Sequence, residues 1–451
     1  MRVIKVLILF ISVFLQNSCY AQNSLTNKMI KEDLNFLSKN LIEISISPFA
    51  RFSEKKYYGK IDSIQLTLKD IDAISPKDFY AVLQPIVSRL QDGHTEISHE
   101  NLFINNDYYI FPYSIDCNTE GIITKDLKSN YLKSNTNVSG ENIIKIDNLN
   151  QKELINLLDL YNSGESKILR IKYGEFYFNQ LFNLLINKGK EYVIIEFGNG
   201  DKQKIKLIKA SDWIQSTNQS SKESDFYSYN ISNNQAILNL KSFNNLEKFK
   251  KLLNNMFKEI EEKNIQNLII DLRGNGGGNS ALGDELLKHL LNRPFTQYEK
   301  TLIKYSKPSK KYFSELTDID SIYLKEYLLK KDGLIDTIYK KDKLIIPYEF
   351  KNKFTGKVYL LINSTTYSSA ADFAQAFKYY SLGKIVGNVT GGEIVSKGEA
   401  IKIQLPNSKL YVYISSSIDY NIGASYNDYE GVKPDYEVGI NDAIKFIELL
   451  N

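Results

Sequence analysis

The pattern of hydrophobic and polar residues divides the chain into a helical start, a middle part with short strands, and a final part in which strands and helices alternate. In residues 25–100, apolar positions recur at helical spacing from Asn27 to Leu41. A second helix is expected from Ser75-Pro76 through Leu90, because proline at the first helical position loses no hydrogen bond. We therefore expect a helical N-terminal region, which ends in Gln91-Asp92-Gly93-His94.

The middle part, residues 104–209, contains short runs typical of strands. A strand at Asn142–Ile146 precedes an amphipathic stretch at Gln151–Leu160, and the other expected strands are Tyr108–Tyr113, Gly121–Thr124, Tyr192–Phe197 and Lys204–Ile208. This order indicates a PDZ-like module, in which a sheet edge and a helix hold an extended peptide. The alternative is another small β domain with the same order of elements.

Strands and helices alternate over residues 230–451, which predicts an α/β layer fold. The expected strands are Gln235–Leu240, Asn267–Leu272, Lys357–Ile362, Lys384–Gly387 and Lys409–Ile414, and the expected helices are Leu246–Lys263, Ser280–Leu291 and Ser369–Tyr380. The segment Tyr298–Lys343 is rich in lysine and tyrosine and carries a helix of its own at Ser321–Lys331. We expect it to be a solvated insertion, with a lid over the site as the alternative.

The first 21 residues have the pattern of a signal peptide. Arg2 and Lys5 precede the apolar run Val6–Leu15, and Cys19-Tyr20-Ala21 places small residues at both cleavage positions. A membrane-spanning helix needs about 20 apolar residues, and this run is shorter. We therefore expect a bacterial protein exported to the periplasm, the cell surface or the medium. The alternative is a lipoprotein signal, with a lipid anchor at Cys19 as the membrane attachment.

The composition excludes several classes of function. The 451 residues contain 57 Lys+Arg against 53 Asp+Glu, a net charge of +4, with no basic block that would indicate a nucleic-acid partner. Two cysteines make no disulfide framework, and three histidines with two cysteines do not readily make a zinc cluster. Cys117 is expected to be a buried small hydrophobe. No metal or organic cofactor is expected.

Three segments have candidate chemistry. Asp271–Gly278 is a glycine-rich turn between a strand and a helix, but it fits neither a dinucleotide fingerprint nor a phosphate loop. Its backbone N–H groups could face a developing anion, or it could be a tight turn. The second segment, Asn363–Asp372, lies where a strand turns into a helix, and its serines could be a helix cap or a nucleophile. The third contains His94; His99 and His289 are expected at the surface.

Together with Gly387–Gly392 and Glu430–Asp435, these segments resemble, in the same order, the tail-specific (C-terminal-processing) and tricorn-type serine peptidases. The resemblance implies a ClpP/crotonase-like α/β core at residues 230–451, after a helical region at 22–103 and a PDZ-like module at 104–210. It also implies protein or peptide substrates. The alternative is a catalytically inactive relative that binds peptides or an apolar ligand.

The resemblance also implies the site residues. The nucleophile would be Ser369, with Ser368 as the alternative if the register shifts by one. The oxyanion would be bound by the backbone N–H groups of Gly277 and Ala370, with Gly276 or Gly278 as the alternative to Gly277. His94 would be the general base, as in the tricorn-like branch, with Glu430 as the supporting carboxylate.

Two positions depart from the family pattern. The lysine that the bacterial branch uses 24 residues after the serine is Glu393 here, and Lys397 is the alternative base, although it is out of register. Where tricorn has a serine before its histidine, this chain has Gly93. The connection from the histidine to its carboxylate must therefore differ, and Thr95 is a candidate to orient the imidazole.

Overall fold

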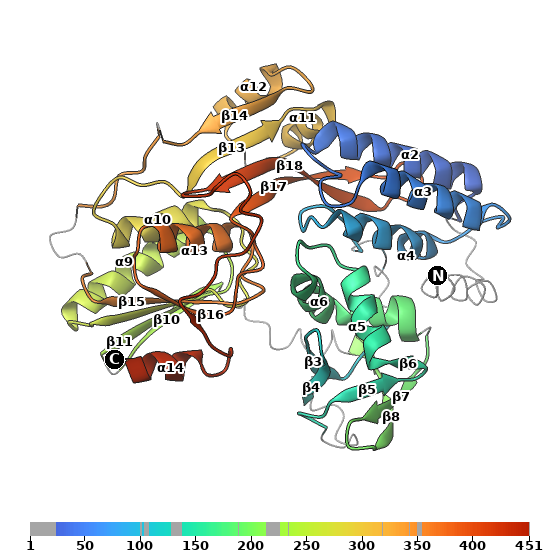
Figure 1. Ribbon diagram of the computed structural model, residues 1–451, viewed down its shortest axis with the longest axis horizontal. Coiled ribbons are helices and arrows are strands. Elements are labelled where there is room, and N and C mark those ends of the chain that lie inside the picture. Colours follow the sequence, from blue (N-terminus) through green and yellow to red (C-terminus); the bar gives the residue numbers. More distant parts are fainter. Residues whose placement is uncertain are drawn as a thin grey trace.

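The computed structural model describes residues 24–99, 102, 108–127, 138–187, 189–212, 226–232, 234–317, 319–341, 343–349 and 354–450. The expected signal peptide, including Cys19, lies outside these residues. Figure 1 shows an α/β lobe, a layer of N-terminal helices and a smaller lobe of helices and strands, with long strands that connect the first two.

The N-terminal region consists of the helices α2 (Asn27–Ile44), α3 (Glu54–Leu68) and α4 (Pro76–Val87). Ser75 caps α4 by accepting a hydrogen bond from the N–H of Asp78, and Pro76 occupies the first turn. The predicted helical region is thus confirmed. A short 3-10 helix, η1 (Ser88–Leu90), extends α4, and Gln91 ends it in a left-handed conformation. This turn points the chain toward His94.

The smaller lobe contains a four-stranded sheet in the order β6 (Leu149–Asn150), β5 (Ile143–Ile146), β7 (Tyr192–Phe197) and β8 (Lys202–Lys206). The predicted helix is α5 (Gln151–Leu160), which begins with a capping box between Asn150 and Glu153. The other elements are β2 (Tyr109–Ile110), β3 (Tyr113–Cys117), β4 (Ile122–Leu127), α6 (Lys167–Phe176), α7 (Phe178–Leu181), η4 (Phe182–Asn187) and β9 (Ile208–Lys209). Cys117 is buried with a free thiol. The assignment of this lobe as PDZ-like stays a prediction.

The α/β lobe is built on a six-stranded sheet. Its order is β10 (Tyr227–Ser232), β11 (Gln235–Leu240), β12 (Asn267–Asp271), β15 (Lys357–Ile362), β16 (Lys384–Gly387) and β19 (Tyr436–Glu437). All neighbours are parallel except β10 and β11. The helices α9 (Leu246–Glu262), α10 (Ala281–Leu290) and α13 (Ser369–Tyr379) cover one face, and α14 (Ala443–Leu450) covers the other (Figure 1). The predicted α/β fold is confirmed.

Alternation along the central strands separates the two faces of this sheet. Leu268 and Ile270 pack in the core beneath α13, whereas Ile269 packs with Ala443 and Ile447 of α14. Because both faces are covered, the strands are almost continuously apolar. The polar turns at their carboxyl ends therefore stand out in the sequence.

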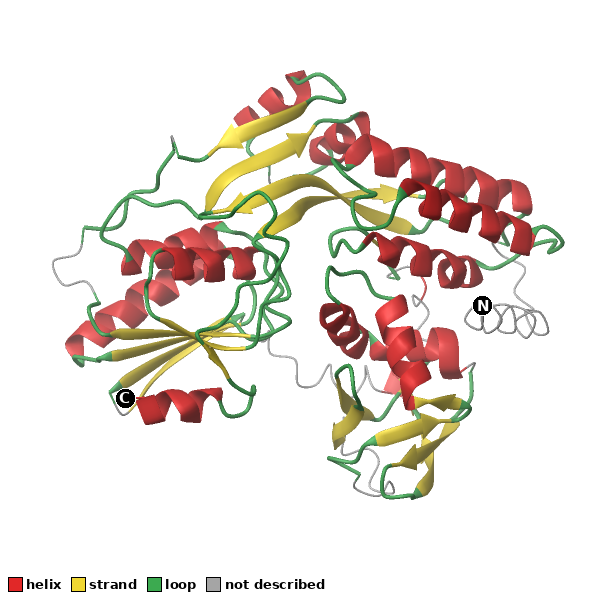
Figure 2. Ribbon diagram, in the orientation of Figure 1, coloured by secondary structure: helices red, strands yellow, loops and turns green. Residues whose placement is uncertain are grey.

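A second sheet connects this lobe to the N-terminal helices (Figure 2). Its order is β1 (Glu96–Ile97), β18 (Tyr411–Asn421), β13 (Tyr298–Lys304) and β14 (Ile335–Tyr339), and β17 (Val395–Gln404) also pairs with β18. The strand β1 follows His94 directly, and its residue Glu96 pairs with Tyr413. This pairing fixes the position of His94 relative to the α/β lobe.

The prediction of a solvated insertion at residues 298–343 is wrong. Its strand β13 pairs along β18, and its helices are α11 (Lys307–Ser314) and α12 (Ser321–Leu329). Ile303, Phe313 and Tyr327 are buried in the core that includes the N-terminal helices. The lysines that suggested a solvated loop lie mainly at exposed or half-buried positions between these residues.

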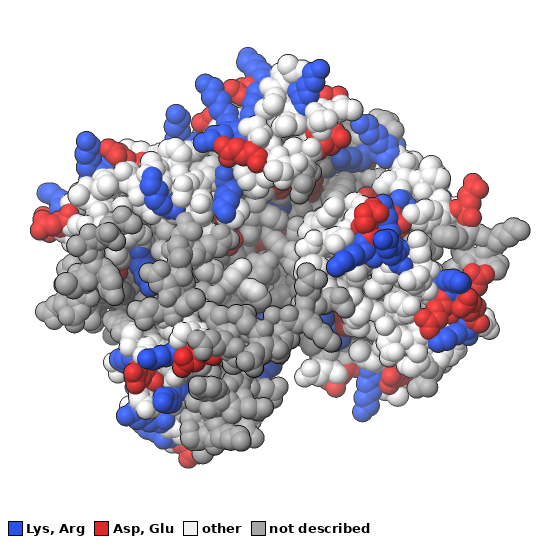
Figure 3. Space-filling model, turned by 180° about the vertical axis from the view of Figure 1, so that it is seen from behind, with Lys and Arg blue, Asp and Glu red and all other residues white. Residues whose placement is uncertain are grey.

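The described surface carries both signs of charge. On the face seen in Figure 3, Lys and Arg side chains are interspersed with Asp and Glu. Within the described residues, no helix combines the length and the apolar character needed to cross a bilayer.

Candidate active site

His94 is held by the turn that precedes β1. Asp92 is buried, and its carboxylate accepts hydrogen bonds from the His94 N–H at 3.0 Å, the Thr95 hydroxyl at 2.7 Å and the Ser415 hydroxyl at 2.5 Å. Burial alone would raise the pKa of Asp92, but Lys397, His94 and these hydroxyl donors hold that pKa below its ordinary value. The turn is therefore fixed by an ionised aspartate. Thr95 gives its hydroxyl hydrogen to this aspartate, not to the imidazole.

Ser368 lies at the turn between β15 and α13, in an unusual backbone conformation. Its φ is +50° and its ψ is −133°, a backbone conformation that residues other than glycine rarely adopt. Backbone strain of this kind is typical of serines that a strand–turn–helix presents to a substrate. Ser368 is half-buried, whereas the next residue, Ser369, is buried.

The structure brings Ser368, and not Ser369, opposite His94. The Ser368 Oγ lies 3.3 Å from the Nε2 of His94. The hydroxyl of Ser369 points elsewhere and donates to the carbonyl oxygen of Gly278 at 2.7 Å. The sequence indicated Ser369 as the nucleophile and Ser368 as the alternative, and the geometry favours Ser368.

The glycine loop packs directly against this serine turn. A Cβ on Gly277, whose φ is +98°, would lie 2.8 Å from the Cβ of Ser368 and 3.0 Å from the N of Ser369. Asn275 holds the loop, because its side chain accepts from the Gly277 N–H and donates to the Leu240 carbonyl. The absence of a side chain at position 277 thus permits the close approach of the two turns.

We expect Gly277→Ala to lower kcat/KM by about 100-fold, because its methyl group would displace the serine by more than a near-attack geometry tolerates. The measurement is hydrolysis of a peptide substrate, with circular dichroism to show that the variant folds. Gly276→Ala is the matched control, since a Cβ there meets no atom within 4 Å. Equal activity of the two variants would contradict the role given to this loop.

The two N–H groups expected to bind the oxyanion already have acceptors. The Gly277 N–H donates to Asn275 Oδ1 at 2.8 Å, and the Ala370 N–H donates to the Tyr367 carbonyl at 3.1 Å. The N–H groups of Ser369 and Gly278 have no acceptor among the described residues. Ser369 is the first residue of α13, where backbone N–H groups lack partners within the helix. If Ser368 is the nucleophile, the N–H group of Ser369 belongs to the residue directly after the nucleophile.

Two further residues, which the sequence did not indicate, complete the surroundings of His94. The Tyr367 hydroxyl lies 3.1 Å from the Nδ1 of His94 and donates to Oε1 of Glu165 at 2.9 Å. Glu165 comes from the loop between α5 and α6, about 70 residues after His94 in the sequence. Such a residue has no local pattern, although a tyrosine directly before the two serines is a signal that could have been noticed.

Glu430 and Lys397, the other side chains proposed for the site, are engaged with other partners. Glu430 is exposed and its carboxylate pairs with Lys433 at 2.5 Å. Lys397 pairs with Asp92 at 3.4 Å and donates to the carbonyl of Ser47. Lys397 thus supports the turn that carries His94.

Glu393 occupies the position of the family's lysine. It forms a 2.5 Å ion pair with Arg51. Burial raises the pKa of Glu393 to about 7, although Arg51 opposes the shift. The position at which the family has its lysine therefore carries a carboxylate, Glu393, whose ion-pair partner is Arg51.

Asp92, His94 and Glu165 each offer one ligand atom within 4.8 Å of one another, a spacing that could hold a metal ion. These atoms are already engaged: the Tyr367 hydroxyl lies between His94 and Glu165, and hydroxyl and backbone donors occupy Asp92. The donor set therefore fits a hydrogen-bonded network better than a metal centre.

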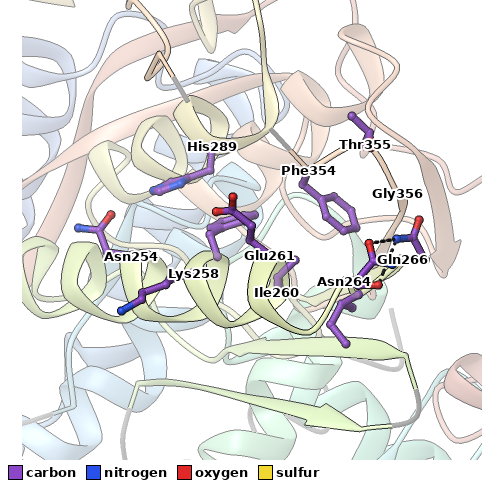
Figure 4. A pocket seen from close by; sticks show the side chains of 12 residues that line it. Asn254, Lys258, Ile260, Glu261, Asn264, Gln266, His289, Phe354, Thr355 and Gly356 are labelled. Atoms are coloured by element: carbon purple, nitrogen blue, oxygen red, sulfur yellow. Dashed lines mark hydrogen bonds between the residues drawn. The ribbon is translucent and has the colours of Figure 1, made fainter. Parts of the chain in front are cut away.

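A cavity of about 400 Å³ lies between α9, α10 and the segment before β15 (Figure 4). Its lining includes His289, which is buried and stacks on Phe257 at 4.5 Å between ring centroids. Burial lowers the pKa of His289 to about 4, so its imidazole is neutral at physiological pH. The expectation of a surface position for His289 is therefore wrong, and none of the proposed site residues lines this cavity.

Comparison with known proteins identifies the α/β lobe. Residues 234–438 match the sequence profile of Peptidase family S41. This part of the chain belongs to peptidase family S41. It contains both the glycine loop and the serine turn, and the recognised resemblance to tail-specific serine peptidases is confirmed. The chain is therefore a serine-type peptidase, with protein or peptide substrates as its family implies.

Solved structures agree with the fold of the chain. The structure of mature CPAF complexed with lactacystin has 15% sequence identity and a TM-score of 0.62, and the match covers 94% of this chain and 98% of that chain. A second structure of mature CPAF has 16% identity and a TM-score of 0.60, with 94% and 96% covered. At such identities the likeness shows the fold alone. No curated protein is a significant match to the sequence.

Proposed function

We propose that the chain is an exported serine endopeptidase that hydrolyses peptide bonds of proteins or peptides, with Ser368 as nucleophile and His94 as general base. The observation that carries this proposal is the 3.3 Å separation of Ser368 Oγ and His94 Nε2. These atoms belong to residues 274 positions apart in the sequence. Export rests on the signal-peptide pattern of the first 21 residues.

The reaction follows from this pair. The Nε2 of His94 takes the proton of the Ser368 hydroxyl as its oxygen attacks the scissile carbonyl. The resulting oxyanion is bound by the N–H groups of Ser369 and Gly278, and one such donor is typically worth about 3 kcal/mol. His94 then protonates the leaving amine. In the second half of the reaction His94 takes a proton from a water molecule as that water attacks the acyl-enzyme carbonyl, and it returns this proton to the Ser368 oxygen as the acid product leaves.

The buried aspartate of α13 fixes the helix that follows the nucleophile. Asp372 accepts hydrogen bonds from Tyr298 and Asn421, each at 2.8 Å. Burial, together with the nearby Asp419, raises the pKa of Asp372 to about 7. The position that carries an acidic residue in the family thus anchors α13 to β13 and β18 and does not face the substrate.

The test uses the full chain, secreted with its own leader. We expect it to degrade an unfolded polypeptide such as reduced, alkylated casein near neutral pH, and a fluorophosphonate to block this degradation. Protein that is folded but neither cleaves such substrates nor reacts with the fluorophosphonate would overturn the proposal. It would favour the inactive, ligand-binding relative.

A further inference from the structure

The Tyr367 hydroxyl connects His94 to a carboxylate from another part of the chain. It lies 3.1 Å from His94 Nδ1 and 2.9 Å from Glu165 Oε1. The same Glu165 oxygen also accepts a hydrogen bond from the Gly93 N–H at 3.1 Å. Gly93, which precedes His94 in the sequence, and Tyr367, which lies beside it in space, therefore both donate to the carboxylate of Glu165.

The directions of these hydrogen bonds follow from the chemistry of the three groups. Burial, and then the Glu165 carboxylate, raise the pKa of Tyr367 well above its ordinary value, so its hydroxyl keeps its hydrogen. A carboxylate only accepts, so this hydrogen goes to Glu165. The Tyr367 oxygen is then left to accept from His94 Nδ1–H. This arrangement leaves the Nε2 of His94 without a hydrogen, facing Ser368.

We propose that Tyr367 and Glu165 form a relay that holds His94 in the tautomer needed for catalysis. This inference rests on the proposed function of Ser368 and His94. When His94 takes the Ser368 proton on Nε2, the Nδ1–H bond and the Tyr367 O–H bond stay intact. The negative charge of Glu165 then stabilises the imidazolium through the hydroxyl between them. Tyr367 and Glu165 are positioning residues, since neither touches the substrate.

The space for this relay depends on the glycine that departs from the tricorn pattern. A Cβ at position 93 would overlap the Tyr367 oxygen and would lie 3.2 Å from Glu165 Oε2. The tyrosine hydroxyl thus occupies the volume that a side chain at position 93 would fill. Glycine at position 93 and tyrosine at position 367 therefore fit each other in space. This fit gives a physical reason why the chain has glycine where tricorn has serine.

Glu165 is held in place by the smaller lobe. Arg170 donates to the carbonyls of Gly164 and Glu165 and pairs with Asp159 at 2.8 Å, so both ends of the loop are fixed. Burial, and then Asp92, raise the pKa of Glu165, whereas a charged His94 and the Gly93 N–H oppose this shift, so the ionised form of Glu165 is favoured most when His94 carries its proton. Glu165 is half-buried as a residue, but its Oε2 atom is buried and has no hydrogen-bond partner among the described residues. A carboxylate kept in this environment is typical of functional sites.

The relay makes the catalytic site a product of three parts of the chain. His94 follows the N-terminal helices, Ser368 and Tyr367 belong to the α/β lobe, and Glu165 belongs to the residues 104–210 expected to be PDZ-like. The smaller lobe therefore contributes directly to the reactivity of His94.

The test compares Tyr367→Phe and Glu165→Gln with two matched controls in the full chain. We expect Tyr367→Phe to lower kcat about 100-fold with KM within about threefold, because His94 loses its acceptor while substrate contacts remain. Glu165→Gln keeps an acceptor but loses the charge, so kcat is expected to fall about tenfold. Its acid limb of kcat/KM should move to lower pH, since the imidazolium loses a nearby negative charge.

The controls are Tyr161→Phe and Glu175→Gln. Tyr161 donates its buried hydroxyl to the Ala81 carbonyl, and Glu175 pairs with Lys172, both away from His94. These variants should keep wild-type kcat and pH profile.

Unchanged kcat and pH profile in both relay variants, with wild-type enzyme active, would overturn the relay and leave the peptidase assignment intact. A lower melting temperature alone would show a structural role and would also overturn it. If Tyr367→Phe does not fold, the pH profile of Glu165→Gln decides.

Discussion

Ser368→Ala is expected to lower kcat by about 10⁴-fold or more, because no other hydroxyl among the described residues is recorded within hydrogen-bond distance of His94 Nε2. The residual rate would come from binding and from the N–H groups of the oxyanion site. Hydrolysis of an unfolded polypeptide near neutral pH measures the loss. Because Ser368 is half-buried at a turn, the alanine variant should keep its fold.

Ser369→Ala is the matched comparison. This variant loses the hydrogen bond to the Gly278 carbonyl but keeps the backbone N–H, so we expect activity within about tenfold of wild type. The opposite ranking, with Ser369→Ala inactive and Ser368→Ala active, would assign the nucleophile to Ser369. The register would then differ from the one that the structure favours.

His94→Ala is expected to lower kcat about 10³-fold, since a positioned general base typically contributes 10²- to 10⁴-fold. The fold should persist, because Asp92 holds this turn through backbone and hydroxyl donors. The measurement is kcat near neutral pH and at mildly alkaline pH, where hydroxide partly replaces the missing base.

Lys397→Met separates the two candidate bases. Lys397 contacts Asp92 and the Ser47 carbonyl, so its loss weakens the support of His94 without removing the base. We expect a loss of about tenfold, far smaller than that of His94→Ala. An inactive Lys397→Met beside a fully active His94→Ala would show that the base is the lysine.

The sequence predicted the α/β lobe closely, because its strands are buried on both faces and its helices are amphipathic. The strands β15 and β16 have the predicted ends, and α13 begins at the predicted Ser369. The second sheet was predicted poorly. Its strand β17 carries Lys397, Gly398 and Glu399 in succession, and its burial pattern has no regular alternation. Pairing with distant β18, rather than local pattern, makes this segment a strand.

The candidate site was predicted in part. The motifs indicated His94, the glycine loop and the serine turn as segments of one site, and these segments lie together in the structure. The choice between Ser368 and Ser369 depends on the positive φ of Ser368. Two adjacent serines in a sequence do not show which of them has this conformation. Glu165 lies in a polar loop that resembles any solvated turn. Its role depends on tertiary contacts between lobes, and the sequence pattern does not contain them.

The most direct test of Ser368 as the nucleophile is the site of fluorophosphonate attachment, determined by mass spectrometry of proteolytic fragments. The reagent reacts with a serine only where a base and an oxyanion site activate it. We predict a single adduct on Ser368, absent from Ser368→Ala and retained, at a slower rate, in Tyr367→Phe. An adduct on Ser369, or folded wild-type protein without any adduct, would contradict this prediction.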